Sequence, residues 1–188
     1  PMTSSVYLDS KLLLAMPNMT DPRFDRSVVY VCSHDESGAM GLVINQPFPS
    51  LTFEDLLEQL DIETDGPVPP LPIHTGGPVE PGRGFVLHSA DFVQESTLVV
   101  SETLALTATV DILTALARGR GPIHHLLALG YAGWGAGQLE QEIQANSWLT
   151  AEADDEIIFN TELEQKWPRA MAKLGINISM LSSDAGHA

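Results

Sequence analysis

The polar residues with the most suggestive spacing lie on a helix that the sequence predicts over Ala136–Asn146. Gln138, Glu142 and Asn146 recur every four residues, so they share one face of that helix, displaced from its apolar side. A row of amides and a carboxylate with no basic partner could line a groove and offer hydrogen-bond acceptors to a ligand. The alternative is a solvated helix face, which is the commoner arrangement for such a row.

The glycine-rich segment Gly130–Gly137 precedes this helix and could place backbone N–H groups around a phosphate. Its spacing is not the dinucleotide fingerprint, and no lysine of a phosphate-binding loop follows. Glu140 and Glu142 would also repel a phosphate at the helix start. We therefore favour a tight turn that needs small residues for close packing. Trp134, within this turn, either offers a partner an apolar face and one N–H donor or fills the core beneath the turn.

Two further polar residues border predicted apolar strands, Asn45 and Arg83. Arg83 is the only basic residue between Arg26 and Arg118, and it either pairs with a carboxylate of the fold or receives an anionic ligand group. We favour the structural pair, because buried charges are usually paired. The candidate binding residues are therefore Trp134, Gln138, Glu142, Asn146, Asn45 and Arg83.

The sequence contains no recognisable catalytic motif. There is no HExxH, no cysteine cluster and no Gly-x-Ser-x-Gly elbow among its 188 residues, so we expect no catalytic residues, no metal and no cofactor. The single cysteine, Cys32, lies in the apolar run Val28–Cys32, where a buried and unreactive thiol is expected. A lone reduced cysteine is typical of a cytoplasmic protein, which is the location we expect.

The charge of the chain disfavours two classes of partner. Its formal net charge is −16, and no Lys or Arg occurs from Ser27 to Gly82 or from Gly121 to Gln165. Binding to duplex DNA requires clustered basic residues that neutralise phosphates. We therefore expect no direct contact with nucleic acid, and none with an anionic membrane surface. No stretch approaches the ~20 apolar residues of a spanning helix.

The predicted elements mix hairpins with inserted helices. Val28–His34 and Met40–Asn45 flank the turn cluster Asp35–Gly38, which predicts a hairpin near the centre of the sheet because both runs are apolar on both faces. The other predicted strands are Leu12–Met16, Ile73–His74, Gly84–His88, Thr97–Val100 and His125–Tyr131.

The remaining helices are predicted over Thr52–Leu60, with Thr52 as the cap, over Thr109–Arg118, and over Glu162–Leu174, with a break or kink at Pro168. Asp61–Leu71 reads as a proline-containing surface loop. The order of elements indicates an α+β fold with a mainly antiparallel or mixed sheet. Pro1 precedes Met2, so we expect Pro1 to be foreign to the natural chain and one domain to span residues 2–188.

Five segments in this order resemble the YqgE/AlgH family of bacterial proteins, from Leu12 to about Leu181. They are Met16–Tyr30, Gly38–Pro47, Gly76–Val79, Arg83–His88 and Gly130–Glu140. The resemblance implies a bifurcated sheet folded into a pseudo-barrel with helices packed outside it. It also implies a loose link to transcriptional regulation in some bacteria, and it supplies no catalytic residues.

Two functional hypotheses follow. The first is a non-enzymatic binding or regulatory protein, since no catalytic motif is present. Because DNA contact is disfavoured, a role in transcriptional regulation would act through a protein partner or be indirect. The second is an enzyme whose site is assembled from scattered strand ends, which spacing along a sequence does not reveal. A deep pocket with converging polar residues would favour the enzyme, and an apolar patch would favour the binding protein.

Overall fold

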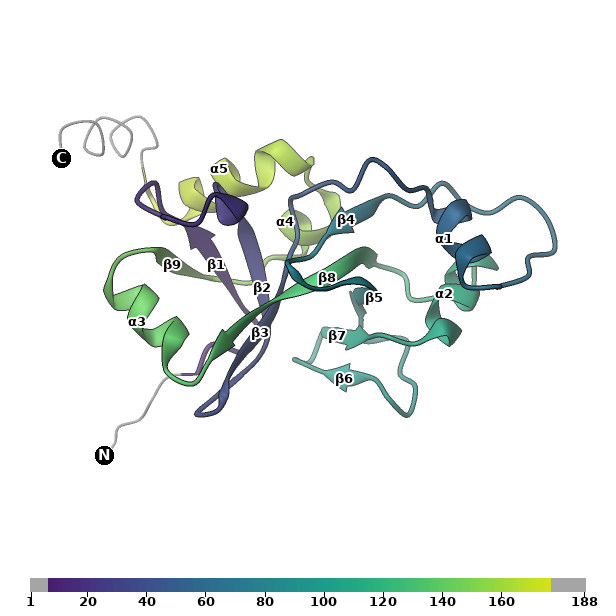
Figure 1. Ribbon diagram of the computed structural model, residues 1–188, viewed down its shortest axis with the longest axis horizontal. Coiled ribbons are helices and arrows are strands. Elements are labelled where there is room, and N and C mark those ends of the chain that lie inside the picture. Colours follow the sequence, from purple (N-terminus) through teal and green to yellow (C-terminus); the bar gives the residue numbers. More distant parts are fainter. Residues whose placement is uncertain (1–6, 177–188) are drawn as a thin grey trace.

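The computed structural model describes residues 7–176 (Figure 1). The predicted domain, residues 2–188, extends beyond the described residues at both ends. The predicted end of the family resemblance, near Leu181, also lies outside the described residues. The described strands are β1 (Lys11–Ala15), β2 (Val28–Asp35), β3 (Gly38–Val43), β4 (Ile73–Thr75), β5 (Val79–Ser89), β6 (Leu98–Val99), β7 (Leu104–Thr107), β8 (His125–Gly135) and β9 (Trp148–Glu152). The helices are α1 (Phe53–Gln59), α2 (Val110–Ala117), α3 (Gln138–Gln144), α4 (Asp155–Asn160) and α5 (Leu163–Lys173), with a short 3-10 turn at Pro22–Phe24.

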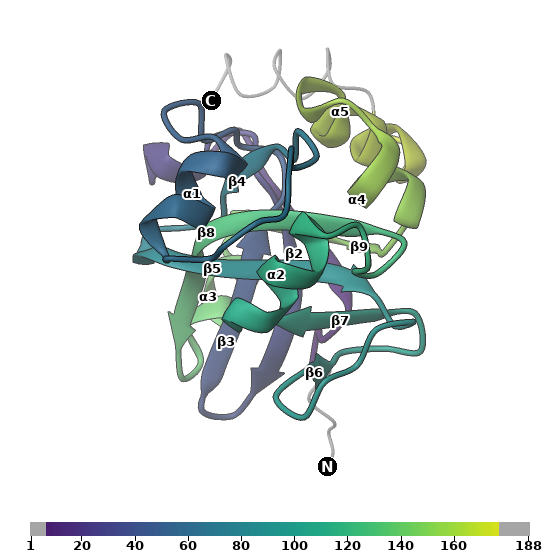
Figure 2. The ribbon, with the colours of Figure 1, turned by 90° about the vertical axis from the view of Figure 1, so that its right-hand side faces the viewer.

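The strands form one curled sheet in the order β6-β7-β5-β8-β3-β2-β1-β9, and β4 pairs with β8 off this path. The β4–β8 pair is parallel and the other pairs are antiparallel. The sheet curls into a half-barrel, with α3 at one end of the molecule and α1 and α2 at the other (Figures 1 and 2). The α+β pseudo-barrel expected from the resemblance is therefore confirmed.

The central hairpin is confirmed as well. Strands β2 and β3 pair antiparallel around the predicted turn, and β3 continues the sheet to β8. Nearly every residue of β2 is buried, because alternate side chains enter different parts of the core. Val28 and Tyr30 pack with α4 and α5, whereas Val29 and Val31 pack with α3.

Strand β8 joins the two arms of the sheet. Its first half pairs with β5 and β4, and its second half, from Ala132 to Gly135, pairs with β3. Gly130 stands at the change of partner with φ of +76°, and a Cβ there would lie 2.3 Å from the carbonyl oxygen of Gly77. A residue without a side chain is required at this crossing of backbones.

Several sequence predictions need correction. The predicted turn over Gly130–Gly137 is mostly strand, because β8 runs to Gly135. The following helix, α3, ends at Gln144 rather than Asn146. Helix α5 continues through Pro168 without a break. Strands β7 and β9 and helix α4 were not predicted.

Candidate functional site

The predicted residue Trp134 lies in the core rather than on an open surface. Its side chain, on β8, is 7% exposed and packs with Val31, Leu139 and Trp148. The two indole rings meet edge to face with centroids 5.9 Å apart. Of the two interpretations of Trp134, the structure therefore supports the one in which the ring fills the core.

Both indole nitrogens donate to one carboxylate oxygen. Trp134 Nε1 lies 3.0 Å and Trp148 Nε1 2.8 Å from Oε1 of Glu142, which is half-buried on α3. The other oxygen, Oε2, accepts a hydrogen bond of 2.9 Å from the side-chain amide of Gln138. The oxygen of that amide accepts from the backbone N–H of Gly135 at 2.9 Å. The cluster thus fastens α3 to β8 and β9.

The structure brings three of the six predicted site residues together. Trp134, Gln138 and Glu142 line a cavity of about 360 Å³ whose other walls include Arg23 and Asp21. The Arg23 guanidinium donates to both carboxylate oxygens of Asp21, which holds the pKa of that carboxyl below its usual range. The polar groups of this cavity are largely engaged with one another, as expected for a cluster that holds elements together.

The other three predicted residues lie elsewhere. Asn146 is exposed beyond the end of α3, with φ of +61°, so the predicted polar row contains only Gln138 and Glu142. Asn45 accepts from the N–H of Val28 and donates to the carbonyl of Arg26, both at 2.9 Å, and so fixes the start of β2. It also lines a separate polar cavity of about 440 Å³.

Arg83 makes the structural pair favoured from the sequence, but on the surface. Its guanidinium lies 3.5 Å from Oε1 of Glu80 and 5.1 Å from the ring centre of Phe85. Both partners of the ion pair are about half exposed, so the pair contributes little to stability.

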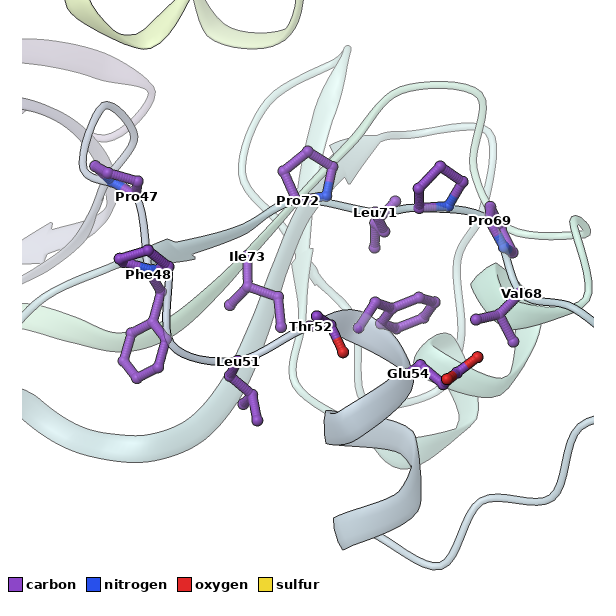
Figure 3. Close-up of a pocket in the computed structure, with 13 residues that line it drawn as sticks. Pro47, Phe48, Leu51, Thr52, Glu54, Val68, Pro69, Leu71, Pro72 and Ile73 are labelled. Carbon is purple, nitrogen blue, oxygen red and sulfur yellow. The ribbon is translucent and has the colours of Figure 1, made fainter.

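A further, mostly apolar cavity was not predicted from the sequence. It has a volume of about 540 Å³ and lies between α1 and the segment Val68–Ile73 (Figure 3). Five prolines line it, so we call it the proline-lined cavity; they are Pro47, Pro49, Pro69, Pro70 and Pro72. Its remaining walls are Phe48, Leu51, Thr52, Phe53, Glu54, Val68, Leu71 and Ile73.

Local sequence explains the shape of this cavity. Thr52 caps α1 by accepting from the N–H of Asp55 at 3.0 Å, and Asp55 accepts in return from the N–H of Thr52. The capping box fixes where α1 starts and turns Phe53 inward. The prolines of the facing segment restrict its backbone φ angles, and proline lacks the N–H that would need a partner on an apolar wall. The high density of prolines on both sides of α1 was the feature of the sequence from which this cavity could have been predicted.

The titratable groups inside the sheet are poorly placed for catalysis. Cys32 is buried, as predicted, and burial raises the pKa of its thiol to about 12. His88 is fully buried, with Nδ1 2.8 Å from the carbonyl of Ser89 and Nε2 2.7 Å from Oγ1 of Thr107, and burial lowers its pKa. Within residues 7–176, no three His, Cys, Asp or Glu side chains gather where they could hold a metal ion. None of the helices described there is long and apolar enough to cross a membrane.

Comparison with known proteins places the chain in a family. The AlgH-like family model matches residues 12–179. A UPF0301 protein of Rhodopseudomonas palustris is 53% identical over 196 residues, which cover 100% of this chain and 90% of that protein. The solution structure of the AlgH protein from Pseudomonas aeruginosa is 46% identical, with a TM-score of 0.81 and full coverage of both chains.

A more distant protein shares the fold. The crystal structure of a Corynebacterium diphtheriae protein is 19% identical, with a TM-score of 0.71 over 92% of this chain and 90% of that one. The matching segments, the half-barrel and these similarities agree, and the chain belongs to the AlgH-like family.

Proposed function

We propose that this protein is a non-enzymatic binding protein whose proline-lined cavity receives an apolar side chain from a basic segment of a protein partner. The observation that carries the proposal is the composition of the cavity. Its walls are almost entirely apolar, and its volume of about 540 Å³ falls in the range of ligand pockets.

The polar groups of the cavity do not suit catalysis. Among its lining residues, only Thr52 and Glu54 carry polar side chains. The Thr52 hydroxyl is already engaged in capping α1. An enzyme site requires a nucleophile or an acid–base pair within hydrogen-bond reach of a substrate, and these walls offer only the exposed carboxylate of Glu54. An apolar side chain fits the cavity better than a substrate that must be activated.

The charge around the cavity indicates the partner. Six carboxylates lie on or just after α1, and no Lys or Arg occurs anywhere from Ser27 to Gly82. The six are Glu54, Asp55, Glu58, Asp61, Glu63 and Asp65. An acidic segment next to an apolar cavity favours a partner segment in which lysine or arginine flanks an apolar anchor. The link to transcriptional regulation implied by the resemblance would then act through a protein rather than through DNA.

A pair of peptides tests the proposal. One alternates leucine with lysine, and the other has serine in place of each leucine, so both carry the same charge. We expect the leucine peptide to shift NMR signals of Leu51, Val68 and Leu71, which line the cavity. The serine peptide should leave these signals in place. Equal shifts from both peptides, or shifts confined to other surfaces, would refute the proposed site.

A further inference from the structure

Another cavity contains a buried lysine that forms no ion pair with any carboxylate among residues 7–176. This cavity, of about 350 Å³, lies between β4, the start of β8 and the helices α4 and α5. Its titratable lining residues are His74, His125, Glu162 and Lys166, and we call it the Lys166 cavity. Most of its other walls are apolar, among them Phe159 and Leu163. It shares Leu71 and Pro72 with the proline-lined cavity but is otherwise separate.

Lys166 is 2% exposed, which is unusual for a lysine. Its Nζ donates to the carbonyl of Ile158 at 2.7 Å and to that of Ile44 at 2.8 Å. Among the described residues, no carboxylate oxygen lies within 4.0 Å of Lys166 Nζ, the distance that defines an ion pair. Burial lowers the pKa of Lys166 to about 8, so the ammonium is mostly charged at neutral pH. An ammonium has three donors, and one of them has no acceptor in the described part of the chain.

The two histidines add unused capacity for hydrogen bonds. His74 Nδ1 lies 2.9 Å from the carbonyl of Leu127 and must donate to it. His125 Nδ1 is buried and has no partner among residues 7–176. Burial lowers the pKa of both rings, so both are neutral at pH 7. An anion in the cavity would favour their protonated forms, in which each ring nitrogen is a donor.

We propose that the Lys166 cavity binds a small carboxylic acid with an apolar body, in its ionised form. The carboxylate group of this ligand accepts a hydrogen bond from the remaining N–H of Lys166. The apolar walls suit the body of such a ligand, and a buried cation without a counter-ion suits its charge. The N-terminus of α5 also favours an anion, because a helix N-terminus carries a partial positive charge. Glu162 at the N-cap makes no side-chain capping hydrogen bond to the backbone N–H groups there. Glu162 is exposed on the wall and is the one lining group that opposes an anion.

The competing explanation is that Lys166 only fastens α5 to α4 and to the end of β3 through the two carbonyls. That role requires no selectivity for anions. Hexanoate and hexanamide are matched probes, since they share the apolar chain and differ in the charged group. Titration of the full-length protein, followed by NMR at His74 and His125, distinguishes the explanations. We expect hexanoate to bind at least about tenfold more tightly than hexanamide at pH 7.

The pH dependence of binding has a defined sign. The carboxylate requires a protonated Lys166, so affinity for hexanoate should be highest below a pH of about 8 and fall as the pH rises through that value. Affinity for hexanamide should not follow this profile. Equal affinity for both probes, or an affinity for hexanoate that does not change between pH 7 and about 10, would overturn the proposal.

Two variants complete the test. Lys166→Met removes the charge and should abolish the preference for hexanoate. Because it also leaves two buried carbonyls without a donor, it could fail to fold, and Glu162→Gln provides the safer comparison on an exposed side chain. Glu162→Gln should strengthen hexanoate binding about twofold and leave hexanamide binding unchanged. If Glu162→Gln alters neither probe, or if a folded Lys166→Met retains the preference, no carboxylate site exists there.

Discussion

The indole nitrogen of Trp134 donates a hydrogen bond of 3.0 Å to the carboxylate of Glu142, which the indole of Trp148 also reaches at 2.8 Å. Two neutral donors on one carboxylate oxygen join strand β8, helix α3 and strand β9 at a single point. The residues predicted from the sequence to form a binding surface therefore stabilise the fold, and their substitution tests this structural role separately from binding.

Glu142→Ala should lower the free energy of unfolding by about 2–4 kcal/mol, because two partly buried indole N–H groups lose their acceptor. Gln144→Ala, at an exposed position of the same helix, is the matched control and should change it by less than about 0.5 kcal/mol. Urea denaturation of both variants measures the difference. Equal stabilities for the two variants would show that the carboxylate does not fasten the helix.

Trp134→Ala should lower the free energy of unfolding by about 3–5 kcal/mol, because the ring fills the core beside Val31 and Leu139. Trp134→Phe keeps an aromatic ring but removes the N–H donor, so it should recover most of that stability. Thermal or urea unfolding provides the comparison. A loss below about 1 kcal/mol in Trp134→Ala would indicate that the ring contributes little packing and would revive its role as a contact surface.

These contacts show what a sequence can and cannot predict about this site. Helical spacing placed Gln138 and Glu142 on one face, and their side chains do bond to each other. Trp148 was missed because β9 is a five-residue strand at the sheet edge, with a half-exposed pattern that gives only a weak signal. The end of α3 was misplaced for a related reason, since helix boundaries depend on local capping more than on periodicity.

Neither the proline-lined cavity nor the Lys166 cavity could be predicted from the sequence, in contrast to the central hairpin. The runs Val28–His34 and Met40–Asn45 were predictable as a central hairpin because burial on both faces leaves a continuous apolar pattern. The proline-lined cavity depends instead on two segments that meet only in the folded chain, around Leu51 and Val68. Lys166 looked like an ordinary helix lysine, because nothing in its neighbours reveals that the carbonyls of Ile44 and Ile158 enclose it.

Cys32 should react slowly with thiol reagents while the protein is folded. Burial raises its pKa to about 12, so very little thiolate exists at pH 8, and the side chain is 2% exposed. Labelling with a chromogenic disulfide in buffer and in denaturing urea measures the two rates. Rapid stoichiometric labelling of the folded protein would contradict the burial of Cys32 and would make it a candidate for redox chemistry.

The Asp154–Lys173 ion pair should make stability depend on pH. The ammonium of Lys173 holds the pKa of Asp154 below its ordinary value of 3.8, and Asp154 also caps α4 through the N–H groups of Glu156 and Ile157. A depressed folded pKa stabilises the protein above the unfolded value, and this contribution is lost as the pH falls through the folded value. Asp154→Ala should therefore cost about 1 kcal/mol at pH 7.

The stability gap between wild type and Asp154→Ala should shrink as the pH falls through 3.8 and below. The exposed neighbour Asp155 supplies the control, since Asp155→Ala removes a carboxylate that makes no ion pair among the described residues and should change the stability little at pH 7. Denaturation at several pH values measures both. A gap for Asp154→Ala that widens on acidification would reverse the assigned sign.

The protein should not retard duplex DNA in a gel at ~150 mM salt, because its net charge of −16 and lack of clustered basic residues oppose counterion release. The same gel with a known basic DNA-binding protein of similar size controls for detection. Sequence-independent retardation by this chain would contradict the expectation and would weaken the case for a protein partner.

Binding of an apolar anchor in the proline-lined cavity is tested most directly by calorimetry with the leucine–lysine peptide on three proteins. They are the wild type, Leu51→Ala, which alters a lining residue, and Ile123→Ala, which alters a residue 76% exposed and outside the cavity. We predict that Leu51→Ala weakens binding about tenfold, as loss of a buried aliphatic contact should. Ile123→Ala should leave the affinity at the wild-type value. An unchanged affinity in a folded Leu51→Ala variant would contradict the proposed function.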